Sequence, residues 1–306
     1  MSLSVSILSV RSGWHTDELL RALSERGHVG VVVPYEGLVA RIGFFRRGGP
    51  SGPPAGEPEG SPLRAEGVPL FESDAVLARI IPSGSLEQII YRVDALHWLE
   101  ERGVPVINSP RAIERAVDKF YTSALLHEAG LPTVETVVCE RAGDAVAAVR
   151  EFGDAVIKPI FGSMGHGLVR VSDPDVAFRV AKTLATTRAV FYVQRAIDHG
   201  GRDYRLFVVG GQVLAAIERR ASDGDWRSNV ARGATATAFN APPEWQDMAV
   251  RAAAAIEADY AGVDLLQGQD GRVYLLEVNG IPGWEGLQSA TGVDVAGAIV
   301  EHVTAR

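Results

Sequence analysis

Cysteine is nearly absent from this 306-residue sequence: Cys139 stands alone, so no intrachain disulfide can form. No evident histidine partner lies near it, and we interpret it as a buried structural thiol. No apolar run approaches the ~20 residues that a transmembrane helix requires. The N-terminal residues MSLSVSILSV also lack the basic region that precedes the apolar part of a secretory signal. These absences predict a cytoplasmic protein with no membrane partner.

Positive charge is in the minority, because Lys and Arg total 30 while Asp and Glu total 38, a formal net charge of −8. This balance argues against a general nucleic-acid-binding surface, although it leaves a local basic site open. Hydrophobic residues make up 46% of the sequence, which is ordinary for a globular protein with sizeable cores. The length suggests about two compact units.

The first hundred residues alternate strand-like and helix-like patterns. Residues 5 to 33 read as strand, helix and strand, and further strands are expected at Ala75 to Ile81 and Val104 to Ile107. This alternation predicts an α/β domain over residues 1–107, with a small parallel sheet covered by helices. The Gly- and Pro-rich run from Gly48 to Pro62 cannot form a regular element, so we expect a long flexible loop there.

Two apolar runs near the C-terminus, Val263 to Leu266 and Val273 to Val278, are separated by Asp270-Gly271. This dipeptide is typical of a two-residue type I′ hairpin turn. Counting back from the turn pairs Gln269 with Arg272 and places Asp264 directly opposite Glu277. Directly opposed side chains lie ~5 Å apart, so the two carboxylates repel each other unless a cation or a proton lies between them.

Asn279 falls on the same strand face as Glu277, two residues further on. Asp264, Glu277 and Asn279 are all oxygen donors, which suit Mg²⁺ or Mn²⁺ better than zinc. The alternative is a solvated polar face on an edge hairpin. The apolar neighbours Leu275, Leu276 and Val278 favour a functional site, because they predict that the strand is buried.

Two lysines occur at positions where a positive charge is unfavourable: one inside an apolar strand and one at the start of a helix. Lys158 lies inside the apolar strand AVIKPI, where a buried ammonium requires an anion. The loop that follows contains Gly162, Ser163, Gly165 and Gly167, whose backbone amides can cradle phosphate oxygens. Lys119 lies in the first turn of a helix that starts at Asp118, where a cation opposes the helix dipole. The alternative for Lys119 is an ordinary exposed lysine.

Arginines gather between residues 205 and 232. Tyr204 to Val209 and Val213 to Ile217 flank Gly210-Gly211 and predict a hairpin, with Arg205 on its inward face. The following segment, ERRASDGDWRSNVARG, contains four more arginines. Guanidinium groups bind phosphate or carboxylate in bidentate fashion, so these arginines indicate an anion site, with a solvated loop as the alternative. The four are Arg219, Arg220, Arg227 and Arg232.

These motifs, taken in order, resemble those of the ATP-grasp superfamily. The segments AAIERRASDGDWRSNVARG and AGVDLL…LLEVNGIPGWEGLQSATGVDVAG resemble the RimK-like branch, which joins a carboxylate to an amine, usually that of L-glutamate. The likeness covers about residues 105 to 306. It implies an α/β fold of the ATP-grasp type over residues 108–306, after the acceptor-recognising domain 1–107. Residues 108–195 would be the nucleotide-binding part, and residues 196–306 the metal-binding and catalytic part.

The resemblance also implies roles for individual residues. Lys119 and Lys158 would hold ATP phosphates under the loop of Gly162, Ser163, Gly165 and Gly167. Gln194, Arg195 and Ala196 would line adenine, largely through backbone atoms, and Asp203 would hold the ribose; Arg195 departs from the family, where Glu is common. Arg227, Ser228 and Asn229 would complete the nucleotide site. Asp264, Glu277 and Asn279 would bind two Mg²⁺ or Mn²⁺ ions, and Arg205, Arg219 and Arg232 would steady the phosphoryl group and the substrate carboxylates.

The implied reaction is that of an ATP-dependent, ADP-producing acid–amino acid ligase. An acceptor carboxylate would take the γ-phosphoryl group to form an acylphosphate, and the amine of L-glutamate would then displace phosphate. We expect a small cofactor as acceptor, such as a pterin or furan one-carbon carrier, and a homo-oligomer, either a dimer or a tetramer. The alternatives are a glutamate ligase that modifies a ribosomal or carrier protein and a non-catalytic ATP-binding regulatory protein.

Overall fold

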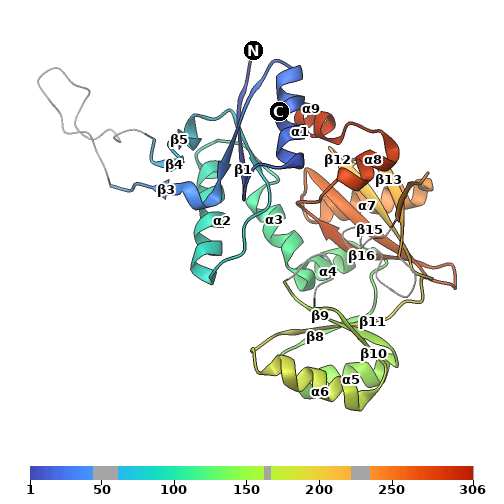
Figure 1. Cartoon of the computed structure of the whole chain (residues 1–306). Coiled ribbons are helices and arrows are strands. Elements are labelled where there is room, and N and C mark those ends of the chain that lie inside the picture. Colours follow the sequence, from blue (N-terminus) through green and yellow to red (C-terminus); the bar gives the residue numbers. More distant parts are fainter. Residues whose placement is uncertain (44–60, 162–166, 222–234, 306) are drawn as a thin grey trace, which may run out of the picture. The chain divides into compact units, whose positions relative to one another are not determined.

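The computed structural model describes residues 1–43, 61–161, 167–221 and 235–305 (Figure 1). The chain forms two compact units. The first comprises Met1–Arg111, Gly283–Glu285 and Asp294–Arg306, and the second comprises Ala112–Pro282 and Gly286–Val293. Among the described helices, none combines the length and the apolar composition that crossing a bilayer requires.

The first unit is built on a four-stranded parallel sheet in the order β2-β1-β6-β7. The central strand β1 is buried from Val5 onward, as expected for a parallel strand covered on both faces. Gly30 on β2 lets helix α1 approach closely, because a Cβ there would lie 2.7 Å from the side chains of Leu20 and Leu23. The elements of this layer are β1 (Ser4–Ser9), α1 (Trp14–Glu25), β2 (Val29–Pro34), β6 (Ala75–Ala78), α2 (Leu86–Glu101) and β7 (Val106–Ile107). The predicted parallel sheet is therefore present.

A small antiparallel sheet, which we did not predict, lies between β2 and β6 along the chain. Its order is β3-β4-β5, with Val39 opposite Arg64. The strands are β3 (Leu38–Ala40), β4 (Leu63–Ala65) and β5 (Val68–Pro69), and two short 3-10 turns, η1 (Tyr35–Gly37) and η2 (Leu70–Glu72), flank them. The predicted loop from Gly48 to Pro62 lies almost entirely outside the described residues.

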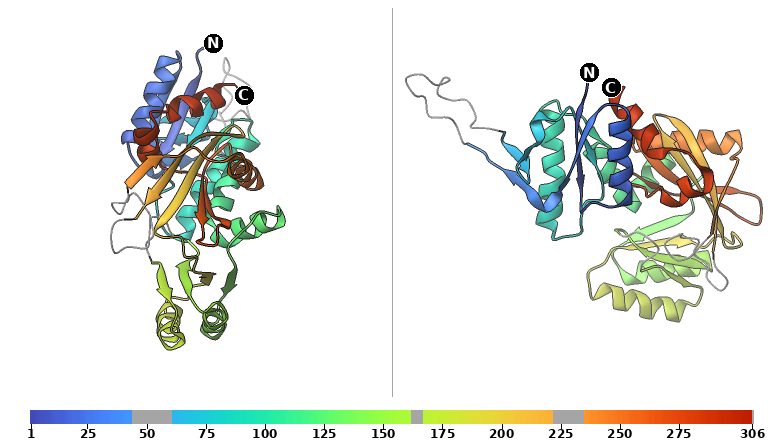
Figure 2. Two further views of the ribbon diagram at one scale, coloured as in Figure 1. Left: turned by 90° about the vertical axis from the view of Figure 1, so that its right-hand side faces the viewer. Right: turned by 45° about the horizontal axis from the view of Figure 1, so that its top comes forward.

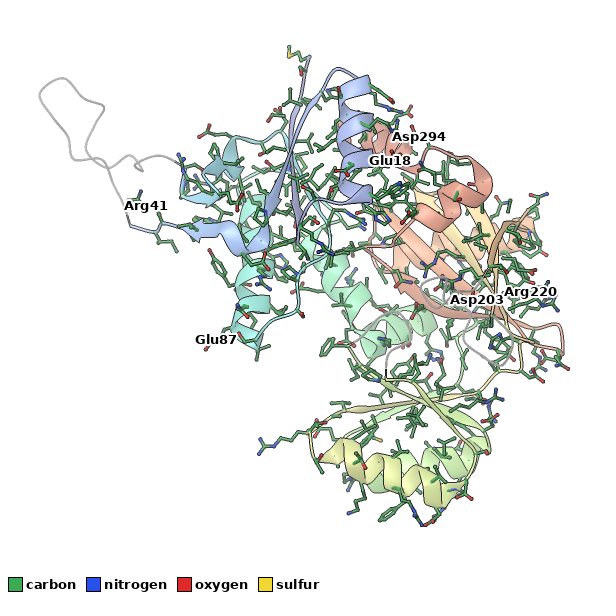
Figure 3. All side chains as sticks on the ribbon, viewed as in Figure 1. Glu18, Arg41, Glu87, Asp203, Arg220 and Asp294 are labelled. Atoms are coloured by element: carbon green, nitrogen blue, oxygen red, sulfur yellow. The ribbon has the colours of Figure 1, made fainter. Side chains whose placement is uncertain are left out.

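The C-terminal helix α9 (Val295–Thr304) belongs to the first unit, whereas we had assigned all of residues 108–306 to one domain. It packs against α1, and Asp294 at its N-terminus accepts a 2.7 Å hydrogen bond from Arg21. Glu18 of α1 and Asp294 lie near each other in Figure 3. Trp284 joins the same unit because its backbone N–H donates to Nε2 of His15 at 3.0 Å. Burial and the charge of Arg79 lower the pKa of His15 to about 4, so this imidazole is neutral and can accept.

The second unit contains a four-stranded antiparallel sheet in the order β10-β9-β11-β8. Helices α5 and α6 lie side by side on one face of it in all views (Figures 1 and 2), over a core that includes Val149, Ile157 and Val193. Cys139 is half-buried at the end of β8, so our interpretation of a buried thiol is wrong. The elements are β8 (Thr136–Cys139), α5 (Ala142–Phe152), β9 (Ala155–Pro159), β10 (Val169–Val171), α6 (Pro174–Ala185) and β11 (Phe191–Arg195).

A five-stranded antiparallel sheet, in the order β14-β13-β12-β15-β16, completes the second unit. One face packs on α7 through a core that includes Leu206, Val263, Trp245 and Ala249. The other face holds the candidate site. The elements are α3 (Pro110–Val117), α4 (Lys119–Glu128), β12 (Arg202–Val209), β13 (Gln212–Arg220), β14 (Thr235–Ala238), α7 (Pro243–Ala255), β15 (Tyr260–Gln267), β16 (Val273–Asn279) and α8 (Glu285–Thr291).

The two predicted hairpins differ in their turns. Gly210 and Gly211 both have positive φ between β12 and β13, and Val209 pairs with Gln212, so the predicted hairpin is confirmed and its turn has two residues. Between β15 and β16 the predicted two-residue turn is wrong, because Gln267 pairs with Val273 and five residues form the loop. A bulge between Leu275 and Glu277 then shifts the register by one residue and restores the predicted pairing of Asp264 with Glu277.

Candidate active site

Charged side chains form a row across three neighbouring strands of the five-stranded sheet. Arg205 on β12 is directly opposite Asp264 on β15, which is directly opposite Glu277 on β16. Arg205 binds the Asp264 carboxylate in bidentate fashion, with its Nε at 2.7 Å from Oδ1 and a terminal nitrogen at 2.6 Å from Oδ2. The pairing predicted between Asp264 and Glu277 is therefore one part of a longer row that begins with an arginine.

A second arginine closes the row into a network. Arg219 on β13 lies opposite Asp203 on β12, and it donates both to Asp203 and, at 2.9 Å, to Oδ2 of Asp264. Asp203 and Arg220 are labelled on these strands in Figure 3. Asp203, Arg219 and Asp264 are all buried, being 5%, 3% and 2% exposed. Asp203 thus serves the protein interior, which weighs against the ribose-binding role that the resemblance implied for it.

The network is compensated internally. Burial by itself would raise the pKa of Asp264, but the charges of Arg205 and Arg219 overcome it and lower the pKa to about 2. Burial works to lower the pKa of Arg219, and the charges of Asp264 and Asp203 outweigh it and raise it. Asp264 and Arg219 are therefore ionised at neutral pH, and Arg205 and Arg219 both have Asp264 as a carboxylate partner.

A glycine on the same face makes room for Arg205. Gly262 lies two residues before Asp264 on β15 and therefore on the same face of the strand. A Cβ at Gly262 would lie 3.0 Å from Pro282 and 3.6 Å from Cδ of Arg205. That separation from Pro282 is tighter than side chains ordinarily accept. A larger residue would displace either Pro282 or the Arg205 side chain from its position beside Asp264.

Glu277 and Asn279 supply the remaining oxygen donors of the predicted metal site. Asn279 Nδ2 donates to Glu277 Oε1 at 3.2 Å, which confirms that they share one face of β16. Within the described residues no three His, Cys, Asp or Glu side chains gather, so the donor set is two carboxylates and one amide. This all-oxygen set suits Mg²⁺. Asp264 already accepts three N–H groups, so Glu277 is the more available of the two carboxylates.

Both predicted phosphate lysines lie within the electrostatic reach of Glu277. Burial lowers the pKa of Lys158 to about 8, the charge of Glu277 opposes this shift, and the charge of Lys119 adds to it. Burial likewise lowers the pKa of Lys119, again opposed by Glu277. Lys119 donates to the Ile160 carbonyl at 3.1 Å, directly before the Gly-rich loop. The two ammonium groups and the Glu277 carboxylate are therefore close enough to influence one another electrostatically.

Lys158 meets an amide, and not the carboxylate that a buried lysine usually requires. Its Nζ donates to Gln194 Oε1 at 2.6 Å and lies 5.8 Å from the centre of the Tyr192 ring. Within the described residues it forms no ion pair. We expect the anion that Lys158 meets to be a ligand phosphate, and this stays a prediction; the neutral acceptor leaves the positive charge of Lys158 available to such a ligand.

The predicted adenine-binding strand end is partly engaged in the sheet. The backbone N–H of Arg195 donates to Glu135 O at 2.9 Å, and that of Ala196 donates to Asp154 O at 2.9 Å. The Arg195 side chain pairs with Glu135 and donates to Phe152 O at 3.0 Å. Any backbone contact with adenine from these two residues would therefore come from carbonyl oxygens.

Several predicted site residues lie outside the described residues. These are Gly162, Ser163 and Gly165 of the Gly-rich loop, and Arg227, Ser228, Asn229 and Arg232 of the arginine segment. Gly167 is described and has a φ of +74°, a conformation that favours glycine.

Sequence reasoning missed a group of buried and half-buried hydroxyls beside Lys158. Gln194 Nε2 donates to Thr136 Oγ1 at 3.2 Å and to the Tyr192 hydroxyl at 3.3 Å, and that hydroxyl is 2.7 Å from Ser123 Oγ. Isolated Ser, Thr and Tyr residues have no distinguishing spacing. The one available signal was that Tyr192 and Gln194 are two residues apart, so that on a strand they share one face.

Comparison with known proteins decides the family. Residues 116–303, more than half of the chain, match the model of the RimK-like ATP-grasp domain. The chain belongs to the RimK-like ATP-grasp family. The tetrahydromethanopterin:alpha-L-glutamate ligase of Methanosarcina acetivorans is 36% identical over 268 residues, which are 79% of this chain and 83% of that protein. A probable alpha-L-glutamate ligase of Trichodesmium erythraeum is 34% identical over 305 residues, 98% of this chain and 96% of that protein.

The fold is also similar to that of a solved structure. The ATP-grasp ligase PsnB, complexed with a minimal precursor, Mg and ADP, matches with a TM-score of 0.72 at 22% identity, over 98% of this chain and 97% of that one. The ATP-grasp fold, the RimK-like branch and the class of ATP-dependent amide-forming ligase are thereby confirmed for this chain. The fold implies the use of ATP with Mg²⁺.

Proposed function

We propose that this RimK-like ATP-grasp ligase joins the amine of L-glutamate to the carboxylate of a small cofactor of the pterin or furan one-carbon type. The support for this substrate pair is the relative from Methanosarcina acetivorans, which is named for tetrahydromethanopterin and glutamate. The observation that best supports the chemistry is that Lys119, Lys158 and Glu277 lie in one unit, close enough for the charge of Glu277 to raise the pKa of both lysines against the effect of burial.

In this proposal the two lysines bind the phosphates of ATP, and Glu277 and Asn279, together with Asp264, hold Mg²⁺. The metal, when bound, neutralises the charge that develops on the transferred phosphoryl group. Arg205 and Arg219 steady the phosphoryl group or substrate carboxylates beside Asp264. Arginine is suited to both anions because its planar fork donates two parallel hydrogen bonds.

The reaction would proceed in two displacements. An oxygen of the acceptor carboxylate attacks the γ-phosphorus, the bond from that phosphorus to the β–γ bridging oxygen breaks, and ADP leaves. The glutamate amine then attacks the acyl carbon, phosphate leaves with the former carboxylate oxygen, and the amine loses a proton to give the amide. Water must be excluded between the steps, since it would hydrolyse the acylphosphate.

The test is an incubation of the purified protein with ATP, Mg²⁺, L-glutamate and single candidate acceptors, with ADP and product masses as readouts. We expect ADP to form only when glutamate and a carboxylate acceptor are both present, and the product to be heavier than the acceptor by one or more glutamyl residues. Chelation of the metal should abolish ADP formation. ADP formed only with another amine would reject L-glutamate as the donor. Product formed only on a ribosomal or carrier protein would reject the cofactor, and nucleotide binding without any turnover would reject catalysis.

A further inference from the structure

The polar group beside Lys158 has an ordered direction of hydrogen bonding. The Thr136 hydroxyl donates its one proton to Val134 O at 2.8 Å, so Thr136 Oγ1 can only accept from Gln194. The amide nitrogen of Gln194 must therefore face Thr136, and its oxygen must face Lys158, an ammonium with donors only. The opposite amide orientation would set N–H groups against the ammonium, so the network fixes one arrangement.

The same network connects the elements that carry both lysines. Tyr192 OH accepts from Gln194 and lies 2.7 Å from Ser123 Oγ on α4. Lys119 is four residues before Ser123 on that helix, one helical turn away on the same side. Gln194 and Tyr192 are 4% and 2% exposed, so the hydrogen bond between them is shielded from bulk water. Helix α4 is thereby tied to the strand pair that holds Lys158.

We propose that Gln194 is a positioning residue that aims Lys158 at the nucleotide phosphates, and that Tyr192, Thr136 and Ser123 hold Gln194 in the required orientation. The inference rests on the proposed nucleotide site. It assigns the Gln194 side chain to the phosphate end of the ligand, whereas the resemblance placed residues 194–196 at adenine. Backbone contacts with adenine at these positions are unaffected.

The chemical identity of the amide matters for this role. A carboxylate at position 194 would form an ion pair with Lys158, neutralise it and repel phosphate. A hydrocarbon there would leave the ammonium without an acceptor and without a fixed direction. A neutral acceptor both orients the ammonium and leaves its charge for the ligand. Glutamine is the residue that meets both requirements at this length.

The experiment measures the binding of ADP, GDP and inorganic tripolyphosphate to the full chain by calorimetry. We expect Gln194→Met to weaken all three by about the same factor, roughly tenfold or more, since a hydrogen bond to a charged group is lost. Gln194→Glu should weaken them further. Tyr192→Phe keeps the ring under Lys158 and removes one contact of Gln194, so a smaller loss in the same direction is expected, and it provides a milder variant should the others fail to fold.

Gln246→Glu is the matched control, because Gln246 is a half-buried glutamine of α7 whose Nε2 donates to Ala241 O at 2.8 Å. It should leave all three affinities unchanged. Loss of ADP affinity alone in Gln194→Met, with tripolyphosphate binding intact, would assign the side chain to adenine and overturn the inference. Unchanged binding of all three ligands would also overturn it. Wild-type protein that binds none of the three would instead reject the proposed nucleotide site itself.

A second readout separates positioning from general loosening of the site. In Gln194→Glu, the new carboxylate should raise the pKa of Lys158, so the pH at which tripolyphosphate binding begins to fail should move upward. A variant that only loosens the structure would weaken binding without moving this pH. An unmoved pH in Gln194→Glu would contradict direct contact between residue 194 and Lys158.

Discussion

The two sheets of the second unit differ in how their cationic side chains are paired: one sheet pairs them with carboxylates and the other with a neutral amide. On the five-stranded sheet, Arg205 and Arg219 are neutralised by Asp264, and Asp203 adds a further bond to Arg219. On the four-stranded sheet, Lys158 is half-buried and contacts a neutral amide and an aromatic ring. A compensated network stabilises the empty protein, whereas an uncompensated ammonium is satisfied only when an external anion arrives. We therefore expect the ion-pair network to stabilise the ligand-free protein in addition to any role in ligand binding, whereas Lys158 should matter mainly for ligand binding.

The largest effect should come from removing the centre of the compensated network. Asp264→Ala leaves two arginines without their shared carboxylate, one of them 3% exposed, and we expect a loss of about 3–5 kcal/mol in the free energy of unfolding. Chemical denaturation measures it. Asp154→Ala is the control, because its pair with Arg170 is 39% exposed on each side and should contribute no more than about 1 kcal/mol. Equal losses in the two variants would refute the distinction.

We expect Glu277 to contribute to activity and little to the free energy of unfolding. Glu277 accepts a hydrogen bond from Asn279, and within the described residues it forms no ion pair. Glu277→Gln should therefore change the free energy of unfolding by less than about 1 kcal/mol and lower the rate of ADP release by at least about a hundredfold, since a metal-binding charge is lost. Steady-state ADP release at several Mg²⁺ concentrations checks this. Full activity at ordinary Mg²⁺ would exclude Glu277 as a metal ligand.

Replacing Lys158 should not lower the free energy of unfolding, in contrast to replacing Asp264. In Lys158→Met a half-buried charge that forms no ion pair within the described residues is replaced by an apolar side chain of similar length, so the stability of the nucleotide-free protein should be unchanged or higher. The affinity for Mg·ATP should fall roughly tenfold to a hundredfold. Thermal unfolding with and without Mg·ATP measures both quantities. Marked destabilisation of the nucleotide-free variant would show that Lys158 belongs to a structural network, as the arginines do.

The sequence was informative where chemistry depends on residue type and less so where it depends on register. The pairing of Asp264 with Glu277 was predicted by counting from Asp270-Gly271, and it is correct only because two register shifts of one residue cancel. The loop is longer than the two-residue turn that we expected, and the bulge before Glu277 compensates for the shift that the loop introduces. Bulges leave no pattern in a single sequence, so such agreement is not general. By contrast, Gly210-Gly211 fixed its hairpin correctly because only positive φ suits that turn.

Partners across the sheets were beyond sequence reasoning. We expected Arg205 and Arg219 to face ligand, and the structure pairs both with Asp264, because β12 lies between β13 and β15 in an order that the sequence does not reveal. The ATP-grasp fold itself was predictable through the resemblance of the segments around residues 219 and 277. The return of α9 to the first unit was not predictable, since it depends on contacts with α1 such as that between Arg21 and Asp294, which are 273 residues apart along the chain.

The smallest predicted effect is the pH dependence of nucleotide binding, which follows from the uncompensated lysine. The pKa of Lys158 is lowered by burial from 10.5 to about 8 in the folded protein. Without nucleotide the neutral amine suits the buried site, so the charged form destabilises the fold below pH 8, and this penalty disappears as the pH rises from 8 toward 10.5.

Phosphate requires the ammonium, so affinity for Mg·ATP should be constant below pH 8 and fall by up to about tenfold per pH unit above it. Calorimetric titrations between pH 7 and 9.5 measure the slope, and Lys158→Met should flatten it. A slope that persists unchanged in that variant would mean that another group, such as Lys119, sets the pH dependence, and that the charge of Lys158 is not what the nucleotide needs.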